Sequence, residues 1–249
     1  MASDRIAMAP HLFVHSESVH QSSRGKYLGD FVYGANDGII TTFAVVSGAA
    51  GATLAPGIIL ILGLANLFGD GISMGLSNFL SLRSRRDFER KQRSIEEREI
   101  EEFPDEERKE VADILRRWGI PEARIGETVI EITKDKKRWT DLMMIEELKI
   151  IEMGDGSPAR HGLATMGAFV VAGALPLIPY LFGIPAEFQF IVSIIATAVS
   201  LFIVGAARTI VTDAPWFRSG LEMLLVGGLA ATAAYGVGAA VKTMFGIII

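Results

Sequence analysis

No cysteine occurs among the 249 residues. The chain therefore has no disulfide framework and no thiolate ligand for a metal, and cysteine usage does not indicate its redox compartment. Histidine is scarce too: three of the four histidines (His11, His15 and His20) lie near the N-terminus. Di-iron carboxylate bundles need a Glu-x-x-His motif on each of two helices, and this sequence holds only one, Glu17 to His20, which argues against an oxidase. No nucleophile–base set or cofactor motif is present, so an enzyme is the least expected class.

The first 30 residues lack the segments of a signal peptide, so the first hydrophobic run is expected to stay in the mature protein. Charge is scarce outside one block: residues 83–160 hold 18 of the 24 Lys and Arg and 21 of the 29 Asp and Glu. Half of the chain is hydrophobic, and several apolar runs exceed the roughly 18 residues that indicate a transmembrane helix. The pattern predicts a membrane protein with one soluble block in its middle, and no nucleic-acid partner is expected.

The apolar runs predict an all-α membrane protein with five transmembrane helices. Each run has about 20 residues or more, which spans a bilayer core of about 30 Å. Pro176 and Pro179 fall late in the third run and predict a kink or an early end there. With five spans, nearly all basic residues would lie on the same side of the membrane as the N-terminus. Because cytosolic loops are enriched in Lys and Arg, the N-terminus is expected in the cytosol and the C-terminus in the lumen. The expected spans are 31–53, 57–82, 162–182, 188–207 and 220–241.

The charged block predicts helices rather than a loop. No Gly or Pro interrupts residues 77–103, so the second span is expected to continue as a helical stalk. A helix from Pro104 to Gly119 and another from about residue 121 to residue 154 complete a cytosolic three-helix domain between the second and third spans. Trp118 and Trp139 are interpreted as core residues of this domain. The expected domains are a disordered cytosolic tail (1–26), the first two spans (27–84), the cytosolic metal-binding domain (85–158) and the last three spans (159–249).

Two carboxylates lie inside predicted spans. Asp37 sits two turns into the first span, in YGANDGIITT (33–42), and Asp70 lies about halfway along the second. An ionisable group at the centre of a membrane helix costs at least about 2.5–3.5 kcal/mol and usually faces a cavity or a partner. Such a carboxylate either binds a proton or stays ionised against a cation. A site that exchanges cations for protons needs both states, so Asp37 is predicted to be functional.

The second span carries polar or sulfur-containing residues at four-residue spacing, on one helix face. With Asn36, Asp37, Thr41 and Thr42 of the first span they are expected to wet a groove between the two helices. A thioether facing a carboxylate would favour a transition metal over Ca²⁺ or Mg²⁺. The asparagine amides either line a translocation path or only form hydrogen bonds between helices, and both interpretations stay open. The methionine is either a metal ligand or an ordinary packing residue. The residues of the second span are Asn66, Asp70, Met74 and Asn78.

Acidic residues are concentrated in the charged block: residues 94–113 contain ten acids and three bases. Several acids recur at i, i+3 spacing on the expected helices, where like charges repel. A solvated surface is one interpretation, and a cluster that captures metal is the favoured one. Carboxylates with thioethers and without cysteine suggest Fe²⁺, Mn²⁺, Co²⁺ or Zn²⁺. The candidate ligands are Glu96, Glu99, Glu107, Glu110, Met143, Met144 and Glu147.

Four segments resemble the vacuolar iron transporter family, its plant members closely, over about residues 26–245. They are GDFVYGANDGIITTFAVVSGAAGA (29–52), GLANLFGDGISMGLSNFLS (63–81), the acidic block and GALPLIPY (173–180). The resemblance implies a homodimer of five-span subunits in the vacuolar membrane that exchanges cytosolic Fe²⁺ for luminal protons. It also implies that Asp37 and Met74 line the translocation path and that the seven candidate ligands bind divalent metal. Asp70 and Asn78 are added to the path from the residue pattern alone.

Two other functions stay open on the residues. A membrane-anchored metal sensor would bind metal and report it to a partner without any flux. A passive cation channel would carry a flux that is indifferent to an imposed pH gradient. The prediction is a divalent-metal/proton antiporter in the lipid bilayer, with Fe²⁺ as its substrate and no prosthetic group; Zn²⁺, Co²⁺ and Mn²⁺ are further candidate substrates.

Overall fold

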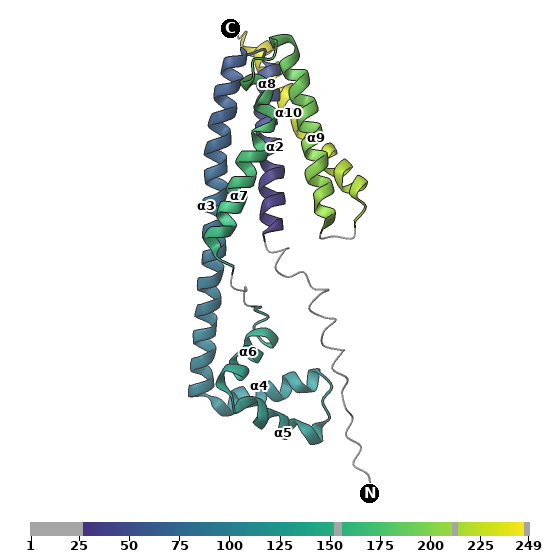
Figure 1. Cartoon of the computed structure of the whole chain (residues 1–249). Coiled ribbons are helices and arrows are strands. Elements are labelled where there is room, and N and C mark those ends of the chain that lie inside the picture. Colours follow the sequence, from purple (N-terminus) through teal and green to yellow (C-terminus); the bar gives the residue numbers. More distant parts are fainter. Residues whose placement is uncertain (1–26, 152–155, 211–213, 247–249) are drawn as a thin grey trace. The chain divides into compact units, whose positions relative to one another are not determined.

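The structure, a computed structural model, describes residues 27–151, 156–210 and 214–246. The predicted disordered tail (1–26), with its three histidines, lies outside the described residues. Every regular element within the described ranges is a helix, which confirms the all-α class (Figure 1). The chain divides into two compact units. We call Leu80–Pro158 the charged unit, and Met1–Phe79 with Ala159–Ile249 the apolar unit.

Four stretches of the described chain are long and apolar enough to cross a membrane: α3, α7 to α8, α9 and α10. The first predicted span, α2, is not among these four. It packs against α9 and α10 (Figure 1) and against the short helix η2. Ten of its 24 residues are buried. A helix enclosed by its neighbours needs fewer apolar residues than a helix that faces lipid. The elements are α2 (Leu28–Gly51), α3 (Pro56–Glu102), α7 (Pro158–Gly173), η2 (Leu175–Leu177), α8 (Ile178–Leu181), α9 (Ala186–Ala207), η3 (Arg208–Ile210) and α10 (Trp216–Phe245).

Small residues let α2 lie close to its neighbours. A Cβ on Gly38 would stand 2.3 Å from the carbonyl oxygen of Phe169 in α7. On the α10 side, a Cβ on Gly238 would stand 1.9 Å from the carbonyl oxygen of Gly48. Close approach of backbones through small residues is a common basis for helix association in membranes. The Gly/Ala-rich last helix thus packs on α2 within one subunit.

The predicted kink or early end in the third span is confirmed as an interruption of its helix, while the apolar span continues to Leu181. Helix α7 ends at Gly173, and η2 and α8 follow it as short helical turns. Pro176 cannot donate a backbone hydrogen bond, and a ring in a helix interior displaces the carbonyl of the preceding turn. The Ser193 hydroxyl of α9 donates to the Pro176 carbonyl at 2.7 Å, which satisfies this buried acceptor.

The charged unit contains the C-terminal part of α3 and the helices α4 (Pro104–Arg117), α5 (Glu122–Thr133) and α6 (Lys136–Glu146). The prediction of one helix from residue 121 to residue 154 was therefore wrong, since α5 and α6 are separate. The break has a local cause: Asp135 caps α6 by accepting a hydrogen bond from the Arg138 amide at 3.1 Å, the arrangement that aspartate favours at helix N-termini.

One of the two tryptophans lies in the core of the charged unit. Trp139 is 4% exposed and packs with Val111, Ile114 and other apolar side chains of α4 to α6. Trp118 is 53% exposed, so its assignment to the core was wrong. It follows the last residue of α4, where Gly119 adopts a φ of +79° and ends the helix.

The contact between α10 and α2 gives a stability prediction with an internal control. Gly238→Ala should destabilise the protein by about 1–3 kcal/mol, the usual cost of overpacking, because the new methyl group meets the Gly48 carbonyl. Gly236→Ala, two residues away, meets nothing within 4 Å, and should leave stability unchanged or raise it slightly because alanine favours helix. Thermal unfolding in detergent measures both variants; equal midpoints would contradict this packing.

Candidate metal centre

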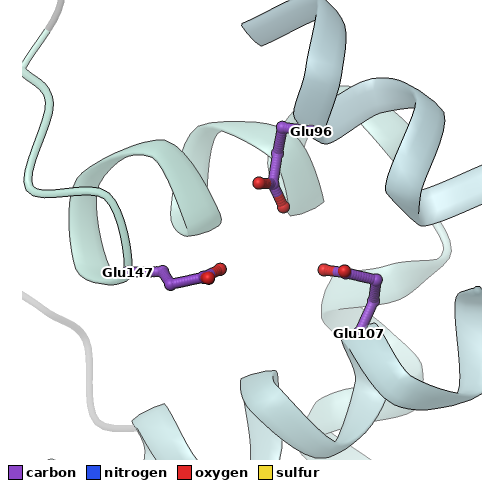
Figure 2. Close-up of side chains that lie close together, drawn as sticks. All are labelled: Glu96, Glu107 and Glu147. Carbon is purple, nitrogen blue, oxygen red and sulfur yellow. The ribbon is translucent and has the colours of Figure 1, made fainter. Parts of the chain in front are cut away.

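Three carboxylates converge in the charged unit. Glu96 comes from α3, Glu107 from α4, and Glu147 directly follows α6. One oxygen of each carboxylate lies within 4.8 Å of the others. Figure 2 shows the three side chains pointing toward a common centre. Three carboxylates from three helices at this spacing form a set of oxygen ligands that a divalent cation can bridge.

Two of these carboxylates are buried without full hydrogen bonding. Glu96 is 2% exposed and Glu107 is 8% exposed. Glu96 Oε1 and Glu107 Oε2 have no hydrogen-bond partner among the described residues. A buried carboxylate is costly unless it is paired, protonated or bound to a metal. Either a proton or a bound cation would satisfy these oxygens.

Burial and mutual repulsion keep protons on this cluster when no metal is bound. Burial, followed by the charges of Glu107, Glu147 and Glu99, raises the pKa of Glu96 to about 8. Burial and then the charge of Glu110 raise the pKa of Glu107 as well. A hydrogen bond between the two carboxyl groups raises the pKa of Glu96 further and partly offsets the rise for Glu107, as expected when one proton is shared and Glu96 is the donor.

Glu147 belongs to the same cluster although it is exposed overall. Partial burial of its carboxylate and then repulsion from Glu110 raise its pKa to about 7. The residue as a whole is exposed while its carboxylate is partly buried, because the side chain points inward, toward Glu96 and Glu107 (Figure 2). Because the pKa of Glu147 is about 7 and that of Glu96 about 8, the cluster changes its proton content near neutral pH.

The structure places the other four candidate ligands in two groups. Glu99 and Glu110 lie close enough for their charges to act on the three central carboxylates, so they join the same electronegative site. Met143 and Met144 are both fully buried. Met143 packs in the hydrophobic core with Trp139, and Met144 borders a hollow lined in part by Arg93 and Asp141.

The apolar unit holds the predicted path residues. Asp37 is half-buried on α2, and its carboxylate lies near enough to Asp70 of α3 for their charges to interact. Met74 is half-buried and packs beside the apolar cluster that contains Phe169. Asp70 itself is exposed on a helix that is apolar enough to cross a membrane.

Asn78 has a different environment from the other path residues. Its amide donates hydrogen bonds to Asp30 of α2 and to Thr165 of α7, each at 2.7 Å. Asp30 also contacts His161 of α7. Sequence reasoning did not single out Asp30 or His161. The available signal was the seven-residue spacing of Asp30 and Asp37, which puts both on one face of α2.

The sequence is similar to known proteins over most of its length. The sequence profile of the VIT family matches residues 28–239. The chain is 36% identical to "Vacuolar iron transporter 1" of Eucalyptus grandis over 220 residues, or 88% of either chain. It is 34% identical to "Vacuolar iron transporter" of Toxoplasma gondii over 242 residues, 93% of this chain and 80% of the relative. It is also 32% identical to "Vacuolar iron transporter 1" of Arabidopsis thaliana over 235 residues, 93% of either chain.

The raised pKa of Glu96 predicts how stability depends on pH. The folded, metal-free protein holds a proton up to about pH 8, whereas a carboxyl group of an unfolded chain loses its proton near pH 4.3. Stability should therefore fall as the pH rises between these values. Glu96→Gln should flatten this decline, because glutamine has no proton to lose. Thermal unfolding in chelator at pH 6 and pH 8.5 measures the effect. Exposed Glu127 provides the control variant Glu127→Gln, and identical profiles for the two variants would contradict the assignment.

Metal binding should displace the protons that the cluster holds. Near pH 7 the binding of one Mn²⁺ should release about one proton, since ligands must be deprotonated, and affinity should weaken as the pH falls from 8 to 6. Calorimetric titration of the whole chain in buffers of different ionisation enthalpy reports both quantities. Glu107→Gln should weaken binding and Glu127→Gln should not; equal weakening by both would place the metal elsewhere.

Proposed function

Since this chain belongs to the VIT family, we propose that it is a divalent-metal/proton antiporter that moves Fe²⁺ from the cytosol into an acidic vacuolar lumen. Its relatives are named vacuolar iron transporters, and none of these names denotes an enzyme. One observation carries the proposal: Glu96, Glu107 and Glu147 converge, the first two with an unsatisfied buried oxygen each, in a chain that also carries carboxylates on its apolar helices. The chain thus has one carboxylate site suited to capture a metal ion and another suited to its passage through the membrane.

The charged unit serves as the capture site on the cytosolic side. Its carboxylates favour hard and borderline divalent cations, and the absence of cysteine disfavours ions that require thiolate. Glu99 and Glu110 add negative charge around the three central ligands and raise the local concentration of cations. Met143 and Met144 are assigned as thioether ligands by the family resemblance. Fe²⁺ is the proposed substrate, and Zn²⁺, Co²⁺ and Mn²⁺ are chemically acceptable alternatives.

The apolar unit serves as the path, with α2 as a fifth span beside the four apolar ones. A charged Asp70 that faced lipid would be costly, so the exposed polar face of α3 needs a cover. A second copy of the chain is the simplest cover, because two-fold symmetry would place Asp37, Asp70 and Met74 of both copies along one groove. The distribution of basic residues favours a cytosolic N-terminus, a cytosolic charged unit and a luminal C-terminus.

Exchange follows from the chemistry of one carboxylate. Asp37 binds the metal together with the thioether of Met74 while it is ionised, and a proton from the acidic lumen competes for the same oxygens. Protonation removes the charge that holds the cation, so the metal leaves on the luminal side. Loss of this proton toward the cytosol restores the site for the next ion. The direction of metal transport is thereby set by the proton gradient.

Two competing functions make different predictions for flux. A metal sensor would bind cations at the charged unit without any transport. A channel would pass cations at the same rate with and without a proton gradient. Metal flux measured with and without a proton gradient therefore distinguishes the three functions.

The transport test uses the whole chain in liposomes with an acidic interior. Asp37→Ala should reduce Fe²⁺ uptake to background, because the ion-exchanging carboxylate is lost. Glu99→Ala combined with Glu107→Ala should raise the KM for metal far more than it lowers the maximal rate, because capture precedes translocation. Wild-type liposomes without a pH gradient and the Glu127→Gln variant serve as controls. Normal uptake by Asp37→Ala would end this mechanism.

A further inference from the structure

The cytosolic ends of three helices are tied together through one carboxylate. Asp30 lies in the first turn of α2. One of its oxygens contacts His161 Nδ1 of α7 at 2.5 Å, and the other accepts a hydrogen bond from the Asn78 amide of α3 at 2.7 Å. The side chains of His161 and Asp30 are only 11% and 15% exposed. We call Asp30, His161 and Asn78 the three-helix tie.

Further contacts hold the members of the tie in place. The Asn78 amide also donates to the Thr165 hydroxyl at 2.7 Å, and the same hydroxyl donates to the carbonyl of His161. The ring of Tyr27 packs on the imidazole with 4.6 Å between ring centroids. Because each oxygen of Asp30 already has a partner, the carboxylate is not available to bind a cation in this arrangement.

The position of the tie connects it to the predicted path. Asp30 and Asp37 are seven residues apart, which places them on the same face of α2 about 10.5 Å apart along the helix. Asn78 and Met74 are four residues apart on one face of α3, a separation of about 6 Å. The tie therefore lies two helical turns from Asp37, toward the N-terminus of α2. In the proposed orientation this is the cytosolic end of the groove.

We propose that the three-helix tie is the cytosolic gate of the groove and that Asp30 becomes its first metal ligand when the gate opens. This inference rests on the proposed transport function. An entering divalent cation competes with His161 and Asn78 for the Asp30 carboxylate, because two positive charges attract it more strongly than hydrogen-bond donors do. Transfer of Asp30 to the cation releases α7 and α3 from α2 and opens the way to Asp37. His161 and Asn78 act as positioning residues, and Asp30 binds the ion.

The same contacts would exist in a purely structural tie, and the two roles differ in one observable. A structural tie affects only the stability of the apolar unit. A gate also controls whether a water-soluble reagent reaches the groove from the cytosolic side, and its state responds to cations. Accessibility therefore separates the two, whereas a loss of stability alone does not.

The absence of cysteine makes a single-cysteine experiment clean. Ser73 is exposed on α3, between Asp70 and Met74, and lies about 7.5 Å beyond Asn78 along the helix. The Ser73→Cys chain is reconstituted in liposomes with its cytosolic side outward and labelled with a membrane-impermeant maleimide. Addition of Mn²⁺ should raise the labelling rate, and Asp30→Asn should abolish this rise. This measurement needs no substitution of His161.

A second variant opens the gate without metal. His161→Ala in the Ser73→Cys chain should raise the labelling rate about tenfold, as expected from the loss of one hydrogen bond to a charged group. His161→Gln keeps an amide donor toward Asp30 and should stay near the starting rate. Arg160→Ala, at the exposed neighbouring position, is the matched control and should not change labelling.

The outcomes separate the gate from the transport function. If Mn²⁺ and His161→Ala leave labelling unchanged while the Ser73→Cys chain still takes up Fe²⁺ along a proton gradient, the tie is structural and the gate is overturned, but transport stands. If labelling rises as expected while no Fe²⁺ uptake occurs, the groove opens to cations but the transport proposal fails.

Discussion

Carboxylates that have no permanent positive partner among the described residues are the constraint on which the rest of this structure depends. Glu96 and Glu107 are buried with unsatisfied oxygens, and Asp37 and Asp70 lie on the helices of an apolar unit. An uncompensated buried charge is so costly that Glu96 and Glu107 require a proton or a cation, and a charged Asp70 would be costly wherever its helix faced lipid. A lysine or arginine at hydrogen-bond distance would relieve this cost and would compete with any cation for the carboxylate.

The cost of an unpaired carboxylate has a different origin in each of the two units. In the charged unit, burial and then repulsion among several acids raise the pKa values of Glu96 and Glu147 toward neutrality, so modest changes in pH alter the number of bound protons. In the apolar unit the cost is set by the low dielectric of the bilayer, and few acids are tolerated. Helix α3 contributes to both, since it carries Asp70 and Met74 as well as Glu96. Close packing of α2 through Gly38 and Gly238 supports the half-buried Asp37 on a well-defined helix.

Much of the architecture could be predicted because it depends on local sequence. Long apolar runs predicted the helices of the apolar unit, and Pro176 predicted the early end of α7. Two predictions were wrong because helix ends depend on local signals that apolar spacing does not contain. The helix expected from residue 121 to residue 154 is divided because Asp135 caps a new helix, a signal that hydrophobic periodicity does not contain. Trp118 was assigned to the core because its spacing continued an apolar stripe, but α4 ends before it.

Sequence alone determined which candidate residues are present and how they are spaced: acids at helical spacing, two carboxylates within apolar runs and no cysteine. Composition and spacing suffice for this, because they act over a few turns of one helix. Only the tertiary structure decided which of these groups meet. Glu96, Glu107 and Glu147 converge from three helices, and Asp30 contacts His161 across 131 residues of sequence. Such contacts depend on how helices pack against one another, and the periodicity of a single segment contains no information about the partner that its polar face will meet.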